Sequence, residues 1–563
     1  MPENSQSSTV PLPATAWKSA LLWTIVLWVP LASMQFLWIA RDTRPMDADP
    51  ANHTIRALDY AHTLFPLRHM PGSFLYLWRH SYGADGMYTY PPLYHVILGV
   101  FCRFTPQPSW AVIATNMAFL VLLLYSVIRI GRRAFDLTIG VTAAALVATY
   151  SYCAFLQHEA FIEFALTAAC AYAAWRLLQT QGFSRRGPSL AAGLCIGLAI
   201  LIKHMAAVYL AGPVLCILWC ERKSLNDKKF VNVLWSMAVA LAVALSWYAL
   251  HIHDLLANLK ANQDYPVDAG IPMPWTIAGM LYYPSKLCSE QTGCVGFVLL
   301  LAAAFLWITR GLSSGAVTPQ RRTARGIIVA YFLVGLLLLT FAFKNKDPRF
   351  STPILPGVAL FTCGGIGLIR ARAVRYWAMG ILALGALPFY TASMFDWPPA
   401  PRDIGFKSAG LDWGIWTSDV DNGPRQEKWP IVPILQRAML KWRGHAPAPR
   451  PLLGLLPYFG HFSPRSFALE AELHDNIPID IEQAGEKPGV EQLERFDFLL
   501  AKPGDQEAQG VDFLTHYAVE FRTYIVAHPA EFRLVGTFLL PDKSIVELYQ
   551  AAHVTRIQKN SSP

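Results

Sequence analysis

Long apolar runs separated by short basic connectors are the feature that most constrains how this chain can fold. The first run, Leu21–Ala40, contains no charged residue. As a helix rising about 1.5 Å per residue, it would span about 30 Å, the thickness of the hydrocarbon core of a bilayer. Further runs cover residues 91–104, 109–128, 137–156, 160–180, 189–220, 230–250, 294–309, 326–343, 353–369 and 374–394. The pattern predicts an α-helical protein that crosses a membrane many times.

Composition supports the membrane class and argues against nucleic-acid binding. Only 15% of the residues are charged, whereas soluble proteins carry about 25%. The formal net charge is +9, but the basic residues fall between the apolar runs, as membrane topology requires. The first run is also longer than the apolar core of about 7–15 residues in a cleaved signal peptide. We therefore expect a retained anchor and no nucleic-acid partner.

The basic connectors predict the orientation of the chain. Five of them, at 129–133, 176–186, 221–229, 310–325 and 370–375, belong in the cytoplasm by the positive-inside rule. Run 189–220 then has both ends inside, so it must be a hairpin of two short helices with Lys203 and His204 at its outer tip. Run 91–104 opens with two prolines and is too short to cross, which indicates a re-entrant or interfacial helix. This gives eleven spans with a cytoplasmic N-terminus.

The chain divides into two predicted domains. Residues 1–395 form the transmembrane domain, and its first outer loop, 41–108, carries the interfacial helices. Residues 396–563 form an extracytoplasmic soluble domain, irregular and rich in Pro and Trp over 396–450 and α/β in pattern over 451–555. We expect the protein in the plasma (inner) membrane, with this domain outside the cell or in the periplasm. Cys288 and Cys294 would lie on the outer side, as a disulfide or as two free thiols.

The stretch "PMDADPANH" follows the first span directly. Asp49 precedes Pro50 and an apolar 3–4 pattern, which predicts a helix with Asp49 at its N-cap. Asp47 is more typical of a loop residue. A metal site built from Asp47, Asp49 and His53 is an alternative, but one histidine with two closely spaced carboxylates is no specific signature.

Two further groups of polar residues fall at the predicted outer face. "LQHEAFIEF" contributes His158, Glu159 and Glu163, and an ionisable group at membrane depth is a functional hypothesis by default. "FAFKNKDPRF" contributes a basic loop where the charge rule expects none. Its cations are Lys344, Lys346 and Arg349. They suit a phosphate, because lysine and arginine donate charge-assisted hydrogen bonds to phosphate oxygens. Lys203 marks the membrane edge or anchors an anionic group.

The order of these motifs resembles that of the GT-C superfamily of polyprenyl-phosphate-sugar-dependent glycosyltransferases. An acidic residue follows the first span, then "PPLY", a carboxylate near the third span, "GLAILIK" and a basic loop before "PILP". The nearest branch is that of bacterial relatives of protein O-mannosyltransferases and of the aminoarabinose transferase acting on lipid A. The resemblance covers about residues 20–370.

This resemblance implies transfer, with inversion, of a sugar from a polyprenyl-phosphate carrier to an acceptor on the outer face. The acceptor would be a glycolipid, a polysaccharide or a protein. Asp49 takes the place of the family's catalytic Asp, and Glu163 that of a second acidic residue. The family's Asp-Glu is Asp49–Pro50 here, and its "KPPL" is "YPPL" with Tyr90. The implied cofactor is none for certain, with a divalent metal left open.

The resemblance and the chemistry together define the expected roles. Asp49 would be the catalytic base, and Glu159, Glu163, His158 and Asp47 would contact or support the acceptor. Arg349, Lys203, Lys344 and Lys346 would bind the donor phosphate. A multi-span lipid or sugar transporter or flippase is the alternative, although paired repeats and broken midplane helices, which are frequent in transporters, are not evident in the sequence.

Overall fold

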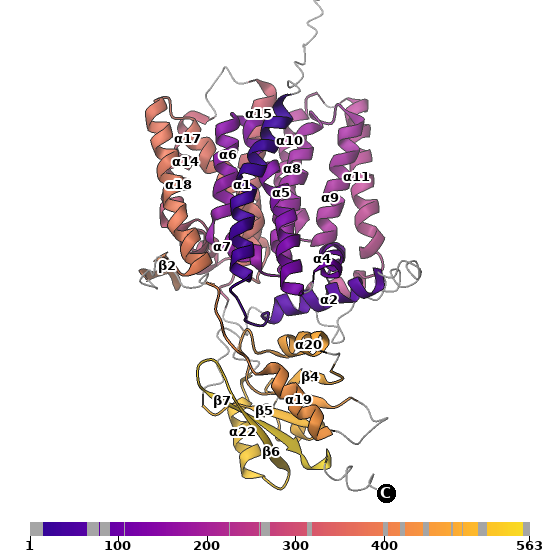
Figure 1. Ribbon diagram of the computed structural model, residues 1–563. Coiled ribbons are helices and arrows are strands. Elements are labelled where there is room, and N and C mark those ends of the chain that lie inside the picture. Colours follow the sequence, from indigo (N-terminus) through magenta and orange to yellow (C-terminus); the bar gives the residue numbers. More distant parts are fainter. Residues whose placement is uncertain are drawn as a thin grey trace, which may run out of the picture.

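The computed structural model consists of a bundle of long helices with an α/β domain attached at one end (Figure 1). The structure describes residues 15–64, 78, 90–105, 107–224, 226–257, 259–260, 271–311, 318–397, 404–416, 423–442, 450–474, 477–486, 488–504 and 515–554. Much of the predicted first outer loop, residues 65–77 and 79–89, therefore lies outside the described part of the chain.

Seven helical segments of the described chain are long and apolar enough to cross a membrane. They comprise α1 (Thr15–Ile39), α5 (Pro108–Ala134), α11 (Asp227–Tyr248), α14 with η3 (Gly293–Gly311), α15 (Pro319–Ala342), α16 to α17 (Pro348–Gly367) and α18 (Arg372–Phe395). A bent pair, α6 (Leu137–Thr149) and α7 (Ser151–His158), passes the same test together with a 64° bend. The helical membrane fold is confirmed, whereas the count of eleven spans stays a prediction.

The run 189–220 forms two short helices, as predicted. The helix α9 (Arg186–Ile202) ends where Lys203 adopts an extended backbone, and α10 (Ala206–Glu221) begins after two further residues. Helix α8 (Ile162–Gln179) packs against α9. The break therefore brings Lys203 to the same end of the bundle as the first turn of α8.

Two helices mark the end of the bundle that faces the α/β domain (Figure 1). Helix α2 (Ala48–Leu64) packs on α4 (Leu93–Phe104), and α4 is the short helix predicted from "PPLYHVILGVF". At Gly99 a Cβ atom would lie 2.6 Å from the carbonyl oxygen of Ala57, so only glycine allows this close approach. The close packing fixes α2, which carries Asp49, on α4.

One helix boundary differs from the prediction. Helix α2 begins at Ala48, so Asp49 lies in the first turn and is not the N-cap. Asp47 precedes the helix instead, and its carboxylate accepts a hydrogen bond from the backbone N–H of Ala48. Pro50 is compatible with either start, because a proline in the first turn loses no intrahelical hydrogen bond. Asp49 still experiences the favourable N-terminal end of the helix dipole.

The C-terminal domain is built on a five-stranded sheet of order β4-β3-β5-β7-β6. Its strands are β3 (Leu452–Leu455), β4 (Asp480–Gln483), β5 (Phe498–Ala501), β6 (Phe532–Leu539) and β7 (Ile545–Ala551). Strand β3 pairs parallel with β4 and β5, whereas β7 pairs antiparallel with β5 and β6. Helices α19 (Ile431–Trp442), α20 (Pro464–Leu473) and α22 (Ala518–Ala527) complete it. Buried aliphatic and aromatic side chains on both faces of the sheet form its core.

The region 396–450 is more regular than expected. It contains α19 and an antiparallel hairpin of β1 (Ile404–Ser408) and β2 (Leu411–Trp416). The hairpin packs against α13 (Ile277–Lys286) and the π-helix η2 (Leu287–Gln291). Cys288 and Cys294 are free thiols in this structure.

Candidate active site

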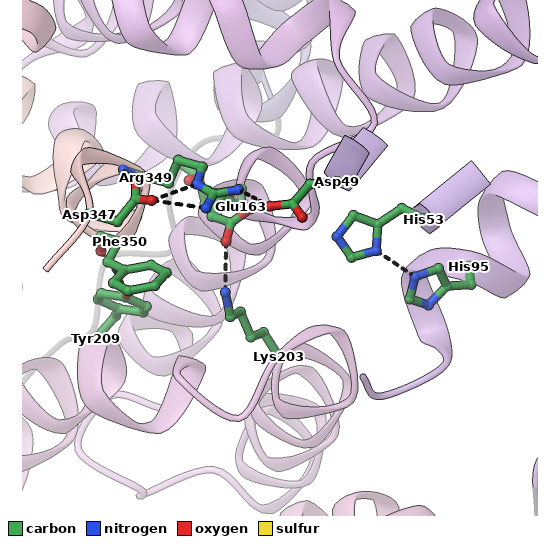
Figure 2. Close-up of polar contacts among 10 residues, drawn as sticks. Asp49, His53, His95, Glu163, Lys203, Tyr209, Asp347, Arg349 and Phe350 are labelled. Carbon is green, nitrogen blue, oxygen red and sulfur yellow. Dashed lines mark hydrogen bonds and ion pairs between the residues drawn. The ribbon is translucent and has the colours of Figure 1, made fainter. Parts of the chain in front are cut away.

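The guanidinium of Arg349 joins two carboxylates from distant parts of the chain (Figure 2). Its Nη1 donates to Asp49 Oδ2 at 2.7 Å. Its Nε and Nη2 donate to Asp347 Oδ2 at 3.0 and 2.9 Å. Asp347 is the N-cap of the short helix α16 (Pro348–Ser351), and Asp49 lies in the first turn of α2. The start of α2 is thereby linked to the start of the span that follows α15.

A second ion pair lies beside the first. Lys203 Nζ donates to Glu163 Oε1 at 2.7 Å. The Lys203 ammonium also lies 4.9 Å from the centre of the Phe350 ring. The hydroxyl of Tyr209 donates to the backbone carbonyl of Phe350 at 2.6 Å, which links α10 to the segment that carries this ring. Lys203 lies at the break between α9 and α10, and Glu163 lies in the first turn of α8.

The members of the cluster differ in their access to solvent. The Asp49 side chain is 55% exposed, against 23% for Arg349 and 5% for Glu163. Glu163 Oε2 is buried with no hydrogen-bond partner among the residues described. Asp49 is thus the carboxylate that an arriving substrate meets first, and the other groups form the floor beneath it.

Two histidines lie behind Asp49 on the packed faces of α2 and α4. His53 Nδ1 lies 2.9 Å from His95 Nε2, and both side chains are buried (Figure 2). Burial, followed by the positive charge of Arg56, lowers the pKa of His53 well below its usual value. Burial also lowers the pKa of His95. Both rings are neutral at neutral pH, so one can donate the hydrogen bond and the other accept it.

The other candidates, His158, Glu159 and Asp47, are not hydrogen-bonded to this cluster in the described structure. His158 stacks on Trp38 with ring centres 3.9 Å apart, and its Nδ1 is 3.3 Å from Gln35 Oε1. Glu159 lies between α7 and α8. Burial and then the negative charge of Asp47 raise the pKa of Glu159 to about 8. Glu159 and Asp47 therefore form a separate acidic neighbourhood, and His158 is a packed residue of the bundle.

Two of the predicted cations also lie outside the cluster. Lys344 is exposed. Lys346 is buried, and its Nζ donates to the carbonyl oxygen of Thr340 at 2.7 Å, near the end of α15. Burial lowers the pKa of Lys346 to about 8. In this structure the Lys346 ammonium satisfies backbone carbonyls at a helix end and is not presented to a ligand.

In the described part of the chain, the candidates Asp47, Asp49 and His53 do not form a metal site. Within the described ranges no three His, Cys, Asp or Glu side chains are grouped so that they could hold one. His53 is bonded to His95, and the Asp49 carboxylate faces a guanidinium, which occupies the place a cation would take.

Asp347 is the group that sequence reasoning missed. The signal was present in "KDPRF", because Asp before Pro is the same helix-start pattern that singled out Asp49. What the pattern could not show is that this side chain would fold back onto the guanidinium two residues later.

The segment that leads into Asp49 is hydrogen-bonded to the C-terminal domain. His461 Nδ1 donates to the carbonyl oxygen of Pro45 at 2.8 Å, and Ser466 Oγ donates to that of Met46 at 2.8 Å. The backbone N–H of Thr43 donates to Arg425 at 3.0 Å. Apolar residues of α2 also pack with Leu469 of α20. The C-terminal domain thus fixes the segment from Thr43 to Met46, which leads into the helix that carries Asp49.

Comparison with known proteins gives the class of the fold. Residues 89–248 match the family model described as dolichyl-phosphate-mannose-protein mannosyltransferase. ArnT from Cupriavidus metallidurans, solved with undecaprenyl phosphate, superposes with a TM-score of 0.52 at 12% identity, covering 95% of this chain and 98% of that one. The oligosaccharyltransferase AglB from Archaeoglobus fulgidus, solved with an inhibitory peptide and a dolichol-phosphate, gives 0.51 at 12% identity, covering 93% and 74%. No curated protein sequence matches the chain.

The fold is similar to that of ArnT and AglB, which agrees with the resemblance to the GT-C superfamily that the order of the sequence motifs implied. Both solved structures are similar over nearly the whole of this chain, including its C-terminal α/β part. At identities near 12% this likeness defines the fold. The assignment of activity to this chain depends on its own site.

Proposed function

We propose that the protein is an integral membrane glycosyltransferase that moves a sugar from a polyprenyl-phosphate carrier to an acceptor. The family match over 89–248 and the GT-C fold support this class. The observation that carries it is the exposed Asp49 carboxylate, 2.7 Å from the Arg349 guanidinium and beside the buried Lys203–Glu163 pair. A base and a cation stand together at one end of a membrane bundle, where the headgroup of an embedded lipid would lie.

The chemistry needs few groups. The acceptor oxygen attacks the anomeric carbon of the sugar, the bond from that carbon to the phosphate oxygen breaks, and polyprenyl phosphate leaves. Asp49 takes the acceptor's proton, and Arg349 with Lys203 stabilises the charge on the departing phosphate. Phosphate is a good leaving group, so no general acid is required. Attack from the face opposite the phosphate inverts the anomeric centre.

The other acidic residues take supporting roles in this proposal. Glu163 Oε2 is buried and has no hydrogen-bond partner among the described residues, and we assign it to a sugar or acceptor hydroxyl. Asp47 lies next to Gly460 of the C-terminal domain, and its charge acts on Glu159. We assign both residues a supporting role toward the acceptor. His158 supports the helix packing below them. Lys344 is exposed at the rim, where it adds positive charge for an incoming anionic lipid.

We further propose that the site opens to the outer face of the plasma (inner) membrane. The basic connectors support a cytoplasmic N-terminus, and α2, α4 and the C-terminal domain share the opposite end of the bundle from the start of α1 (Figure 1). Replacing the exposed Lys543 with cysteine tests this orientation. In intact cells, or in spheroplasts if an outer membrane surrounds them, a membrane-impermeant maleimide should label the Lys543→Cys protein more strongly than the parent protein, whose own free cysteines set the background. Labelling only after the plasma membrane is permeabilised would reverse the topology.

Glycan profiling of cells that lack the protein tests the function. Glycolipids, polysaccharides and glycoproteins of the deletion strain should lack one sugar that returns on complementation with the wild-type gene. Accumulation of a polyprenyl-phosphate sugar in the same cells would identify the donor. Unchanged profiles together with a defect in uptake or export of a solute would indicate a transporter instead of a glycosyltransferase.

A further inference from the structure

The two carboxylates on Arg349 are not equivalent, and this difference suggests how the site couples its two substrates. Asp347 accepts from Nε and Nη2 through one oxygen, and its other oxygen accepts the backbone N–H of Arg349 at 2.8 Å. Asp347 therefore determines both the start of α16 and the direction of the guanidinium. One guanidinium nitrogen, Nη1, is directed away from Asp347 and toward Asp49.

Exposure distinguishes the permanent partner from the exchangeable one. Asp347 is 26% exposed and lies two residues from the arginine, whereas Asp49 is 55% exposed and comes from another helix. A ligand that reaches the guanidinium from solvent meets the Asp49 contact first. Phosphate oxygens form charge-assisted hydrogen bonds with arginine of the same kind as a carboxylate does. A donor phosphate can therefore replace Asp49 on Nη1 while Asp347 stays in place.

Lys203, the neighbouring cation, is less suited than Arg349 to exchange its carboxylate for a phosphate. Lys203 is bonded to Glu163, and both side chains are at most 10% exposed. Separating that pair would leave a buried charge without a partner, which is costly. Of the two cations in the cluster, Arg349 is the one whose anionic partner is accessible.

We propose that Asp49 occupies the donor-phosphate position on Arg349 in the free protein, and that the arriving phosphate displaces it. Asp347 is the positioning residue that keeps Nη1 directed at this position. While Asp49 Oδ2 accepts the hydrogen bond from Arg349 Nη1, that oxygen is not offered to the acceptor. Displacement frees Asp49 to accept the acceptor's proton only once the donor is bound. This inference rests on the proposed function and adds an order of events to it.

Binding of a short-chain polyprenyl phosphate to the purified full-length protein in detergent tests the exchange without catalysis. Asp49→Asn removes the competing carboxylate and should tighten binding about tenfold, the size of effect expected for one charge-assisted hydrogen bond. Asp347→Asn keeps an oxygen that can cap α16 but loses the hydrogen bonds from Arg349 Nε and Nη2. This variant should bind about tenfold more weakly. Asp59→Asn, on the exposed side of α2, is the matched control and should bind as wild type.

The opposite signs separate this proposal from simple electrostatics. Both substitutions remove one negative charge from the same guanidinium, so repulsion alone predicts tighter binding for both. That result, or unchanged binding by Asp49→Asn, would overturn the exchange while leaving the proposed function intact. Wild-type protein that binds no polyprenyl phosphate would instead overturn the donor class, and the exchange with it. If Asp347→Asn does not fold, Asp347→Glu keeps the charge, displaces the oxygens and should also weaken binding.

Discussion

Lys203 and Glu163 form a 2.7 Å ion pair at the floor of the site, and their side chains are only 10% and 5% exposed. The pair connects the break between α9 and α10 to the first turn of α8. Two buried charges in contact are tolerated because their mutual attraction offsets part of the free energy that each loses on leaving water. The pair therefore supports the shape of the site as well as its charge.

Removing one member of this pair should cost more stability than removing both. Lys203→Met leaves Glu163 buried and unpaired, and should lower the free energy of unfolding by about 3–5 kcal/mol. The double variant Lys203→Met/Glu163→Gln should lose clearly less, because no uncompensated charge remains. Denaturant unfolding in detergent measures both. A double variant as unstable as the sum of the single variants would show that the pair is not coupled.

The His53–His95 contact should make the protein sensitive to acid. Burial lowers the pKa of both histidines below 6.5, so below that pH the unfolded chain binds more protons than the folded one. Stability contributed by the neutral pair is then complete above about pH 6.5 and is lost as the pH falls further.

The variant His53→Asn isolates this effect. Asparagine can still hydrogen-bond to His95 but does not titrate, so the drop in unfolding temperature between about pH 7.5 and about pH 5.5 should shrink. The exposed His253 provides the matched control, since His253→Asn should leave the drop unchanged. Equal acid sensitivity in His53→Asn and wild type would exclude the pair as its source.

The C-terminal domain should influence catalysis through the segment before Asp49. Ser466→Ala/His461→Ala removes two hydrogen bonds to the carbonyls of Met46 and Pro45, each worth about 1 kcal/mol. We expect kcat to fall about tenfold without weaker donor binding, because the base and not the phosphate position is loosened. Ser544→Ala, in the turn between β6 and β7, should retain wild-type kcat. A loss of donor affinity instead would place the domain's effect elsewhere.

The sequence predicted the arrangement of the site better than its pairings. Long apolar runs are strong local signals, and so are Asp–Pro at a helix start and a lysine within an apolar hairpin. Four expected residues, Asp49, Glu163, Lys203 and Arg349, do gather at one end of the bundle. Their roles remain those proposed above.

Other features depend on contacts that no local pattern encodes. Lys344, Lys346 and Arg349 look alike in sequence, but the end of α15 turns Lys346 onto backbone carbonyls, whereas Asp347 turns Arg349 toward α2. His53 meets His95 because α2 and α4 pack closely at Gly99, a register set by tertiary structure. The fold of 396–450 was missed because its hairpin is stabilised by packing on the bundle.

The central claim is that Asp49 is the base of a sugar transfer from a polyprenyl phosphate. It is tested most directly by transfer from a polyprenyl-phosphate sugar in vesicles that contain Asp49→Asn, Asp59→Asn or wild-type protein in equal amounts. We predict that Asp49→Asn loses transfer by about 10²–10⁴-fold, the usual contribution of a positioned base, while Asp59→Asn transfers normally. Normal transfer by Asp49→Asn would contradict the account.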